Sequence, residues 1–346
     1  MRYRLLGRTG LYVSELCMGT MTFGGTSGLW KVVGGLAQEA STALVKQAFD
    51  AGVNFFDTAN VYGLGESETI TGQAIRKLGL ARDELVIATK AYGVMKDKVV
   101  NAGGQSRYHL MHQLDASLQR LQLDHIDLYQ LHGYDPLTPL DEVLSALNDM
   151  VRSGKVRYIG LCNMAAWQIM KGLGISDKRN LARFESVQAY YTIAGRDLER
   201  EVVPLLQDQQ LGLMVWSPLA GGLLSGKFNA DGTGPDGARR ASFDFPLVDK
   251  PRAFRCVEAM RAVAQRHGAT VAQVALAWLL SRQHVTTVIM GARTTAQLAD
   301  NLGSMRLTLD PDDLKALDEV SNLPAEYPGW MLTRQGEPRL KAPGQQ

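Results

Sequence analysis

The 346-residue sequence contains only three cysteines, Cys17, Cys162 and Cys256, and they are far apart in the chain. None belongs to a C-x-x-C pair, whereas disulfide frameworks use even sets of cysteines and structural zinc sites use closely spaced pairs. His109 and His112 are three residues apart on a predicted helix, but no third ligand is apparent, so we expect a solvated helix face there. The sequence therefore predicts no disulfide, no zinc site and no metal ion at the functional site.

The sequence also lacks a charge bias and a long apolar run. The net charge is only +2, which argues against a nucleic-acid-binding surface. The longest largely apolar stretch, Val271 to Leu280, is too short to cross a bilayer. The first ten residues, MRYRLLGRTG, do not contain the apolar segment of a secretory signal. We therefore expect a cytoplasmic protein that binds neither nucleic acid nor membrane.

The chain does contain eight short apolar segments that alternate with helical patterns. This alternation is typical of an α/β fold with a parallel sheet. We expect one domain over residues 1–346, with a β-hairpin at 3–17, the alternating segments at about 16–309, and a helix and tail at 310–346. The specific prediction is a (β/α)8 TIM barrel with an N-terminal hairpin cap and long loops on its active face.

Most of the predicted strands end in a polar or aromatic side chain. These residues are Asp57, Lys90, His132, Asn163, Gln188, Trp216 and Arg293. In a closed barrel the carboxyl ends of the strands form one ring, so these side chains would converge on a single pocket. No strand is followed by G-x-G-x-x-G, which further favours the barrel over a Rossmann fold.

The stretch GVNFFDTANVYGLGESE, from Gly52 to Glu68, contains the first candidate catalytic residues. Asp57 ends its strand, Tyr62 follows in the loop, and Lys90 and His132 end the next two strands. A nearby ammonium favours the phenolate form of a tyrosine. Asp57 would pair with Lys90, while His132 could orient or polarise a substrate oxygen. These groups suit proton transfer at a carbonyl or hydroxyl oxygen, and a redox reaction would need an organic cofactor.

The second half of the ring matches the needs of a nicotinamide cofactor. Asn163 and Gln188 offer amides for a carboxamide, and Trp216 offers a flat face for a pyridine ring. The segment SPLAGGLLSGK provides a glycine-rich backbone and Lys227 for a pyrophosphate. Arg293, at a predicted helix start, could bind a phosphate with two hydrogen bonds, which favours NADP over NAD.

Together these motifs resemble those of the aldo-keto reductase superfamily. The similar segments, in order from about Tyr3 to Leu309, are LLGRTGLYVSELCMGTMTFG, FFDTANVYGLGESE, IATK, LHGYD, SVQAYY, WSPLAGGLLSGK and IMGARTTAQLADNL. The resemblance implies an NADPH-dependent reductase that converts aldehydes or ketones to alcohols. It implies Tyr62 as the general acid of a tetrad with Asp57, Lys90 and His132. Among the branches of the family, the chain is similar to bacterial reductases of bulky alicyclic ketones, including keto forms of trichothecene mycotoxins.

The resemblance also implies the contacts with NADPH or NADP+. The implied residues are Met21, Asp57, Cys162, Asn163, Gln188, Trp216, Ser217, Leu219, Gly221, Lys227, Gly291, Arg293, Gln297 and Asn301. Cys162 stands where the family usually has serine, and a thiol forms a weaker hydrogen bond. Thr294 and Gln297 also form a T-x-x-Q capping pattern, so Gln297 serves either the helix or the adenosine.

The loops at 24–36, 91–105 and 219–250 would determine the substrate, and the last of them is a candidate lid. Trp30, Tyr92 and Trp330 predict an apolar pocket for a bulky ketone or an aryl aldehyde. Two other functions remain open. One is a cofactor-binding regulatory barrel similar to the potassium-channel β-subunits, and the other is an aldolase or isomerase that uses a lysine Schiff base. No repeat or heptad indicates an oligomeric state.

Overall fold

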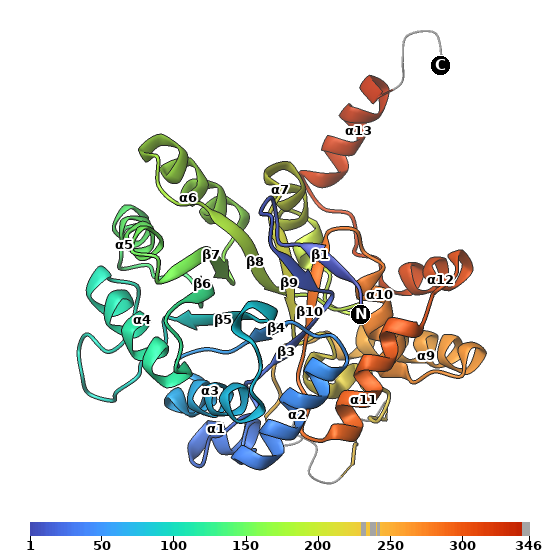
Figure 1. Cartoon of the computed structure of the whole chain (residues 1–346). Helices are drawn as coiled ribbons and strands as arrows, with labels where there is room; N and C mark the ends of the chain where they lie inside the picture. Colours follow the sequence, from blue (N-terminus) through green and yellow to red (C-terminus); the bar gives the residue numbers. More distant parts are fainter. Residues whose placement is uncertain (230–232, 236–239, 241–242, 341–346) are drawn as a thin grey trace.

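The structure, a computed structural model, describes residues 1–229, 233–235, 240 and 243–340, except for the side chains of 338–340. Eight parallel strands form a closed barrel in the order β10-β3-β4-β5-β6-β7-β8-β9, surrounded by helices (Figure 1). The strands are β3 (Leu16–Gly19), β4 (Phe55–Asp57), β5 (Val86–Ala91), β6 (Ile126–Leu131), β7 (Val156–Cys162), β8 (Phe184–Tyr190), β9 (Gly212–Trp216) and β10 (Val285–Met290). The predicted TIM barrel is confirmed.

A small antiparallel hairpin precedes the barrel. It consists of β1 (Tyr3–Leu5) and β2 (Tyr12–Ser14), and its turn lies close to the barrel wall. Gly7 has a φ of +59°, and a Cβ there would lie 2.3 Å from the carbonyl oxygen of Glu185, so only glycine fits. The buried apolar cluster that joins the hairpin to the barrel interior contains Leu6, Val13, Cys17, Phe55, Val86, Ala88, Leu128, Met214 and Ile289.

Amphipathic helices cover the outside of the barrel. They are α2 (Gln38–Asp50), α3 (Glu66–Leu78), α4 (Arg107–Leu121), α5 (Leu140–Arg152), α6 (Ala166–Arg179), α7 (Val202–Gln209), α9 (Lys250–His267), α10 (Val271–Leu280), α11 (Thr295–Gly303) and α12 (Pro311–Ser321). Helices α4 and α11 each begin at a hydroxyl cap, and that of α11, Thr294, is the predicted one. Ser106 Oγ accepts from His109 N at 3.2 Å to start α4, and Thr294 Oγ1 accepts from Gln297 N at 3.1 Å to start α11.

Other helices lie where the sequence did not predict them. The glycine-rich loop 24–36 contains the short helix α1 (Gly28–Val33), and the tail contains α13 (Gly329–Leu340), which projects away from the barrel (Figure 1). Helices α6 and α7, by contrast, follow β7 and β8 as the predicted (β/α)8 alternation requires. Glycine and proline normally interrupt helices, so α1 and α13 resemble loop and tail in the sequence.

His109 also differs from its prediction. Its side chain is only 1% exposed, so the solvated face predicted for it is wrong. The imidazole Nδ1 lies 3.2 Å from the carbonyl oxygen of Asn101, in the loop that precedes α4. Burial lowers the pKa of His109, and the residue therefore acts as a neutral packing group.

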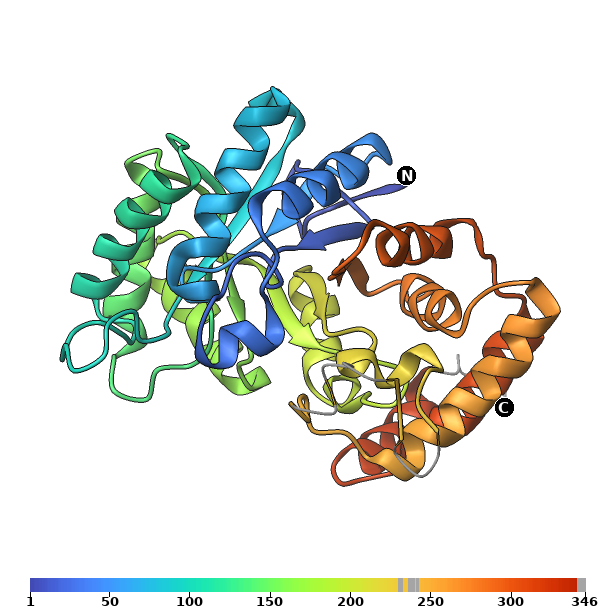
Figure 2. The ribbon, with the colours of Figure 1, turned by 90° about the horizontal axis from the view of Figure 1, so that it is seen from below.

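The two ends of the barrel have different surroundings. Figure 2 shows α1 and the segment after β9 on the side opposite the amino terminus.

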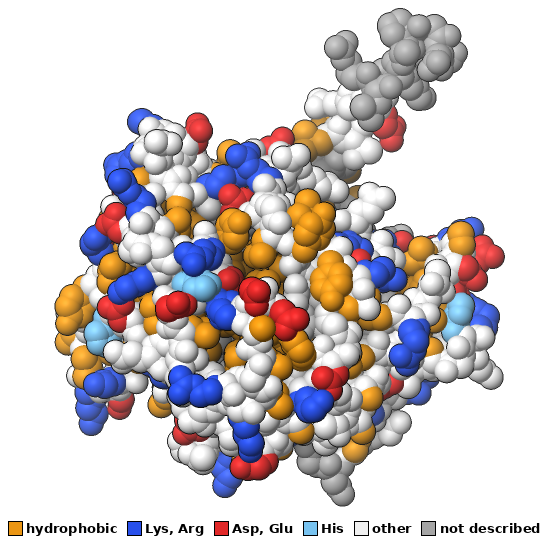
Figure 3. Space-filling model, in the orientation of Figure 1, with side chains coloured by type: hydrophobic (Ala, Val, Ile, Leu, Met, Phe, Trp, Pro, Cys, Tyr) orange, Lys and Arg blue, Asp and Glu red, His pale blue; other side chains and the backbone are white. Residues whose placement is uncertain are grey.

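On the face in Figure 3, positive and negative side chains are interspersed, in keeping with the net charge of +2. Among the described residues, no helix combines the length and the apolar character needed to cross a membrane.

Candidate active site

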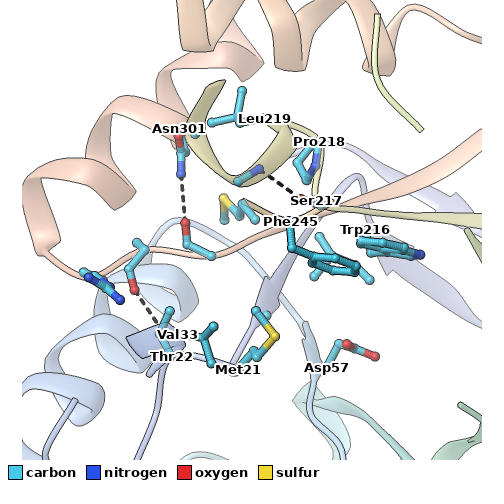
Figure 4. Close-up of a pocket in the computed structure, with 18 of the residues that line it drawn as sticks. Met21, Thr22, Val33, Asp57, Trp216, Ser217, Pro218, Leu219, Phe245 and Asn301 are labelled. Carbon is cyan, nitrogen blue, oxygen red and sulfur yellow. Dashed lines mark hydrogen bonds between the residues drawn. The ribbon is translucent and has the colours of Figure 1, made fainter. Parts of the chain in front are cut away.

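A cavity of about 780 Å³ opens at the carboxyl ends of the barrel strands. Part of its lining is drawn in Figure 4, where Met21, Asp57 and Trp216 surround the space. The predicted site residues that line it are Met21, Trp30, Asp57, Tyr62, His132, Asn163, Gln188, Trp216, Ser217, Leu219, Gly221, Lys227, Gly291, Arg293, Gln297 and Asn301. Residues far apart in the sequence therefore meet in one place.

Lys90 lies beneath this cavity and is fully buried. Its ammonium donates to Asp57 Oδ2 at 2.6 Å, to the carbonyl oxygen of Thr58 at 2.8 Å and to the Tyr62 hydroxyl at 3.3 Å. An ammonium has three N–H donors, so each has one acceptor here. The buried charge is thereby compensated, and one donor points at the candidate acid.

A strained turn places Tyr62 at the cavity. The loop after β4 is tied to β5, because Asn60 N donates to the carbonyl oxygen of Lys90 at 3.0 Å. The short helix η1 (Tyr62–Gly65) then contains Gly63, Leu64 and Gly65, all with left-handed φ values of 57°, 54° and 101°. A leucine rarely adopts this conformation. The surrounding contacts therefore impose the turn that exposes the Tyr62 hydroxyl.

Burial and charge adjust the pKa values of these groups. Burial is the largest single influence on the pKa of Lys90 and acts to lower it, but Asp57, Tyr62 and Cys162 together outweigh burial and the net shift is upward. Burial raises the pKa of Tyr62, and Lys90 opposes this shift. Burial, with a smaller contribution from Lys90, lowers the pKa of His132 to about 3. At neutral pH the imidazole is uncharged, and its ring packs edge-on against that of Tyr62, with centroids 5.6 Å apart.

Sequence analysis missed a buried glutamine beneath Asp57. Gln130 Nε2 and Gln188 Nε2 both donate to Asp57 Oδ1, each at 3.0 Å. Gln130 Oε1 in turn accepts from Gln188 Nε2 at 3.3 Å and from the Cys162 thiol at 3.9 Å. A polar residue inside the apolar strand IDLYQLH was the available signal. Cys162, predicted to contact the cofactor, is fully buried and does not line the cavity.

Trp216 and Asn163 form one wall of the cavity. Trp216 Nε1 donates to Asn163 Oδ1 at 2.9 Å, and Asn163 Nδ2 donates to the carbonyl oxygen of His132 at 3.3 Å. The Trp216 ring contacts Tyr190, and it is nearly parallel to that of Phe245, with centroids 5.9 Å apart (Figure 4). Phe245, which precedes α9, was not among the predicted site residues.

The backbone after β9 has a shape suited to an anion. Ser217, Ala220, Gly221 and Gly222 have φ values of 50°, 49°, 66° and 97°, and Gly221 N donates to Ser217 Oγ at 3.2 Å. Turns with left-handed residues can direct successive N–H groups into one concavity, which binds phosphates. A Cβ on Gly222 would lie 3.3 Å from Lys227 Nζ, so glycine leaves room for that ammonium beside the loop. Ala220 N, Gly221 N and Gly222 N, however, already donate within the loop, to Ser217 O, Ser217 Oγ and Leu219 O, so the binding of a pyrophosphate here stays a prediction.

The other end of the cavity lies at the start of α11. Gln297 Oε1 accepts from Arg293 N at 2.9 Å, one residue before the N-cap Thr294, so Gln297 supports the start of α11 without completing the predicted capping box. Asn301 Nδ2 donates to the carbonyl oxygen of Gly291 at 3.4 Å, and the Arg293 guanidinium donates to that of Val32 in α1. Contacts of these side chains with an adenosine phosphate stay a prediction.

Two predicted substrate residues do not reach the cavity. Tyr92 is half-buried, near Gly133, and Trp330 is 44% exposed on α13. Neither lines the cavity. Trp330 is remote from it because the tail forms a projecting helix instead of returning over the barrel (Figure 1). Trp30 is the exception, and its ring centroid lies 5.8 Å from that of Tyr62. The candidate lid at 219–250 lies partly outside the described residues.

One group of potential metal ligands lies elsewhere. Among the described residues, His267, Asp310 and Asp313 come close enough together to share an ion. The Asp313 carboxylate instead accepts hydrogen bonds from Arg266 and from His267. Asp310 and Asp313 also form the capping box of α12. These contacts give the group a structural role.

A parallel α/β barrel with titratable side chains at the carboxyl ends of its strands has the layout of a barrel enzyme. The Aldo/keto reductase family model matches residues 15–322, and the chain belongs to this family. It is therefore an oxidoreductase of the class that acts on small carbonyl compounds with nicotinamide cofactors.

Three relatives illustrate the range of this family. An uncharacterized oxidoreductase, YrpG, of Bacillus subtilis (strain 168) is 39% identical over 92% of this chain and 96% of that protein. A putative voltage-gated potassium channel subunit beta of Schizosaccharomyces pombe is 37% identical over 92% and 93%. A versiconal hemiacetal acetate reductase of Aspergillus parasiticus is 32% identical over 95% and 99%. The chain is thus similar to both a reductase and a channel subunit.

Proposed function

We propose that this protein is an NADPH-dependent reductase of aldehydes and ketones, with Tyr62 as the proton donor. The observation that carries the proposal is the Tyr62 hydroxyl, which faces the cavity 3.3 Å from the buried Lys90 ammonium. A bound nicotinamide cofactor supplies a hydride to the carbonyl carbon. Tyr62 donates a proton to the carbonyl oxygen, and Lys90 stabilises the phenolate that remains.

The other polar residues orient the reactants. Neutral His132 can donate a hydrogen bond to the carbonyl oxygen, and Asp57 keeps Lys90 charged and in place. Asn163 and Gln188 line the cavity and would bind the carboxamide, and Lys227, which follows Trp216 in the lining, would bind the pyrophosphate. Three candidate roles, those of Cys162, Tyr92 and Trp330, are dropped because none of these residues lines the cavity.

The lining also supports a substrate class. The cavity lining includes aromatic side chains together with aliphatic ones. Trp30 lies next to Tyr62, and Phe243 and Phe245 lie on the side of Trp216. Aromatic walls favour apolar, planar or cyclic groups over small polar ones. We therefore expect aryl aldehydes and bulky alicyclic ketones to be better substrates than short polar aldehydes. Separately, we expect the enzyme to act in the cytoplasm.

The experiment that tests this function measures NADPH oxidation at 340 nm with an aryl aldehyde, an alicyclic ketone and a short polar aldehyde. Turnover with the apolar carbonyls supports the reductase. NADPH binding without turnover would instead support the regulatory alternative, which is less favoured because all four candidate catalytic side chains are present. The Schiff-base alternative is opposed by Lys90, whose raised pKa and three acceptors keep it a protonated ammonium.

Arg293→Ala is expected to weaken NADPH binding by about 10- to 100-fold and NADH binding by less than about threefold. The reason is that charge-assisted hydrogen bonds contribute about 1.5–3 kcal/mol each, and only NADPH carries the 2′-phosphate. Fluorescence titration with both cofactors measures the two affinities. Arg306→Ala, on the nearby but separate helix η5 (Ser304–Arg306), is the control. Equal losses for both cofactors would contradict the phosphate assignment.

The rate of carbonyl reduction is expected to show no His132 titration near pH 6.5. Because the pKa of His132 is lowered to about 3, the imidazole stays neutral throughout the usual working range. Between pH 3 and 6.5 the unfolded chain binds more protons at this residue, so stability falls as the pH decreases through that window. A kcat profile from pH 5 to 8 checks this. A step near pH 6.5 that disappears in His132→Asn would overturn it.

A further inference from the structure

Gln130 is a buried polar residue to which the proposed mechanism assigns no role. It lies inside β6, is fully buried, and does not line the cavity. Both the nitrogen and the oxygen of its side-chain amide nevertheless make hydrogen bonds. Gln130 Nε2 donates to Asp57 Oδ1 at 3.0 Å, while Gln130 Oε1 accepts from Gln188 Nε2 and from the Cys162 thiol.

The partners on the oxygen side fix the orientation of this amide. Gln188 Nε2 and the Cys162 thiol are donors, so they require the carbonyl oxygen of Gln130 on their side. The amide nitrogen must then face Asp57, which as a carboxylate only accepts. Flipping the amide would set donor against donor at Gln188 and leave Asp57 Oδ1 with one donor fewer. The network therefore permits a single arrangement.

In this arrangement the two oxygens of the Asp57 carboxylate have different hydrogen-bond partners. Oδ1 accepts from the two glutamine amides, and Oδ2 accepts from Lys90 at 2.6 Å. With Oδ1 held, the carboxylate cannot rotate, so the direction of the Lys90 ammonium is fixed as well. The contact from Lys90 to the Tyr62 hydroxyl is the longest of its three, at 3.3 Å. It is therefore the contact that rotation of the carboxylate would break first.

We infer that Gln130 is a positioning residue for proton transfer, and that it acts through Asp57 and Lys90 on the Tyr62 hydroxyl. The inference rests on the proposed reductase function. Gln188, a cavity residue, donates both to Asp57 and to Gln130, so the cavity wall and the proton donor share one hydrogen-bonded network. Cys162 contributes to this network as a donor to Gln130 and has no contact with the cavity.

The first test is Gln130→Met, which keeps the volume and removes the amide. Loss of a charge-assisted hydrogen bond predicts a decrease in kcat of about 10- to 100-fold. The NADPH dissociation constant, measured by fluorescence, should stay within about twofold. Thr287→Val is the matched control, because Thr287 is fully buried in β10 and its hydroxyl donates to the carbonyl oxygen of Ser14 at 2.8 Å. A Gln130→Met kcat within about twofold of the control's would overturn the proposal.

The second test is Gln130→Glu, which distinguishes positioning from packing. The introduced carboxyl can donate to Asp57 only while protonated, so kcat should fall with rising pH in a step that the unsubstituted protein lacks. The titratable groups that face Asp57 are Lys90, Tyr62, Cys17 and Cys162, and burial raises the pKa of both thiols. None of them ionises between pH 5 and 8. A pH profile unchanged by Gln130→Glu would overturn the proposal.

These outcomes are separate from the test of the reductase function itself. If the unsubstituted protein does not oxidise NADPH with any carbonyl, the proposed function fails before Gln130 is tested. If it does, the ratio of kcat between each variant and the unsubstituted protein tests Gln130 alone. Should Gln130→Met fail to fold, Gln130→Glu at low pH retains both a donor and an acceptor and carries the test.

Discussion

Tyr62→Phe is expected to lower turnover of carbonyl substrates by about 10²- to 10⁴-fold, the usual contribution of a positioned general acid. The substitution removes only the hydroxyl, which receives a hydrogen bond from Lys90 and faces the cavity. The aromatic ring remains, so its contacts with Trp30 and His132 are preserved. NADPH affinity should therefore change by less than about twofold. Steady-state kinetics and fluorescence titration measure the two effects.

Tyr129→Phe is the control for this experiment. Tyr129 is fully buried in β6 and does not line the cavity, and among the described residues its hydroxyl makes one long hydrogen bond, 3.5 Å to the carbonyl oxygen of Leu110. Its removal should leave kcat near that of the unsubstituted protein. If Tyr62→Phe retained comparable turnover, Tyr62 would no longer be the proton donor.

Lys90→Met is expected to abolish turnover and to lower the free energy of unfolding by about 3–5 kcal/mol. The side chain is fully buried, so its removal leaves the Asp57 carboxylate without its cationic partner. The two glutamine amides remain on Asp57 Oδ1, but Oδ2 loses its 2.6 Å contact. Chemical denaturation measures the stability, and NADPH oxidation at 340 nm measures the turnover.

A double variant separates the two effects of Lys90. Asp57→Asn combined with Lys90→Met removes both charges, so most of the lost stability should return while turnover stays absent. Lys46→Met is the control, since Lys46 pairs with Asp50 on the surface and exposed pairs contribute only about 0–1 kcal/mol. A single Lys90→Met variant as stable as the Lys46→Met control would contradict the role of the buried pair.

The strand ends were the most predictable part of the fold. Asp57, Lys90 and His132 each follow an apolar segment, and parallel strands in a barrel necessarily bring such ends together. The caps Ser106 and Thr294 could be predicted equally well, because a hydroxyl before a helical pattern is a local signal. These features depend on neighbouring residues in the chain, which one sequence displays directly.

Other features depend on contacts between distant residues. Gln130 looks like an isolated polar residue in a strand until the barrel sets it beside Asp57 and Gln188. Phe245 belongs to the predicted loop 219–250, and only the fold shows that its ring meets Trp216. The sequence assigned Trp330 to the substrate pocket by residue type alone. It could not show that α13 directs this side chain away from the barrel.

The central claim is that a hydride moves from the cofactor to a carbonyl carbon at this cavity. The most direct test incubates the protein with an aryl aldehyde and NADPH that carries deuterium at C4, and analyses the alcohol by mass spectrometry and proton NMR. We predict one deuterium on the carbinol carbon, from one face of the C4 position, and formation of that alcohol about 10²- to 10⁴-fold more slowly with Tyr62→Phe. An alcohol without deuterium, or no alcohol despite tight NADPH binding, would contradict the claim.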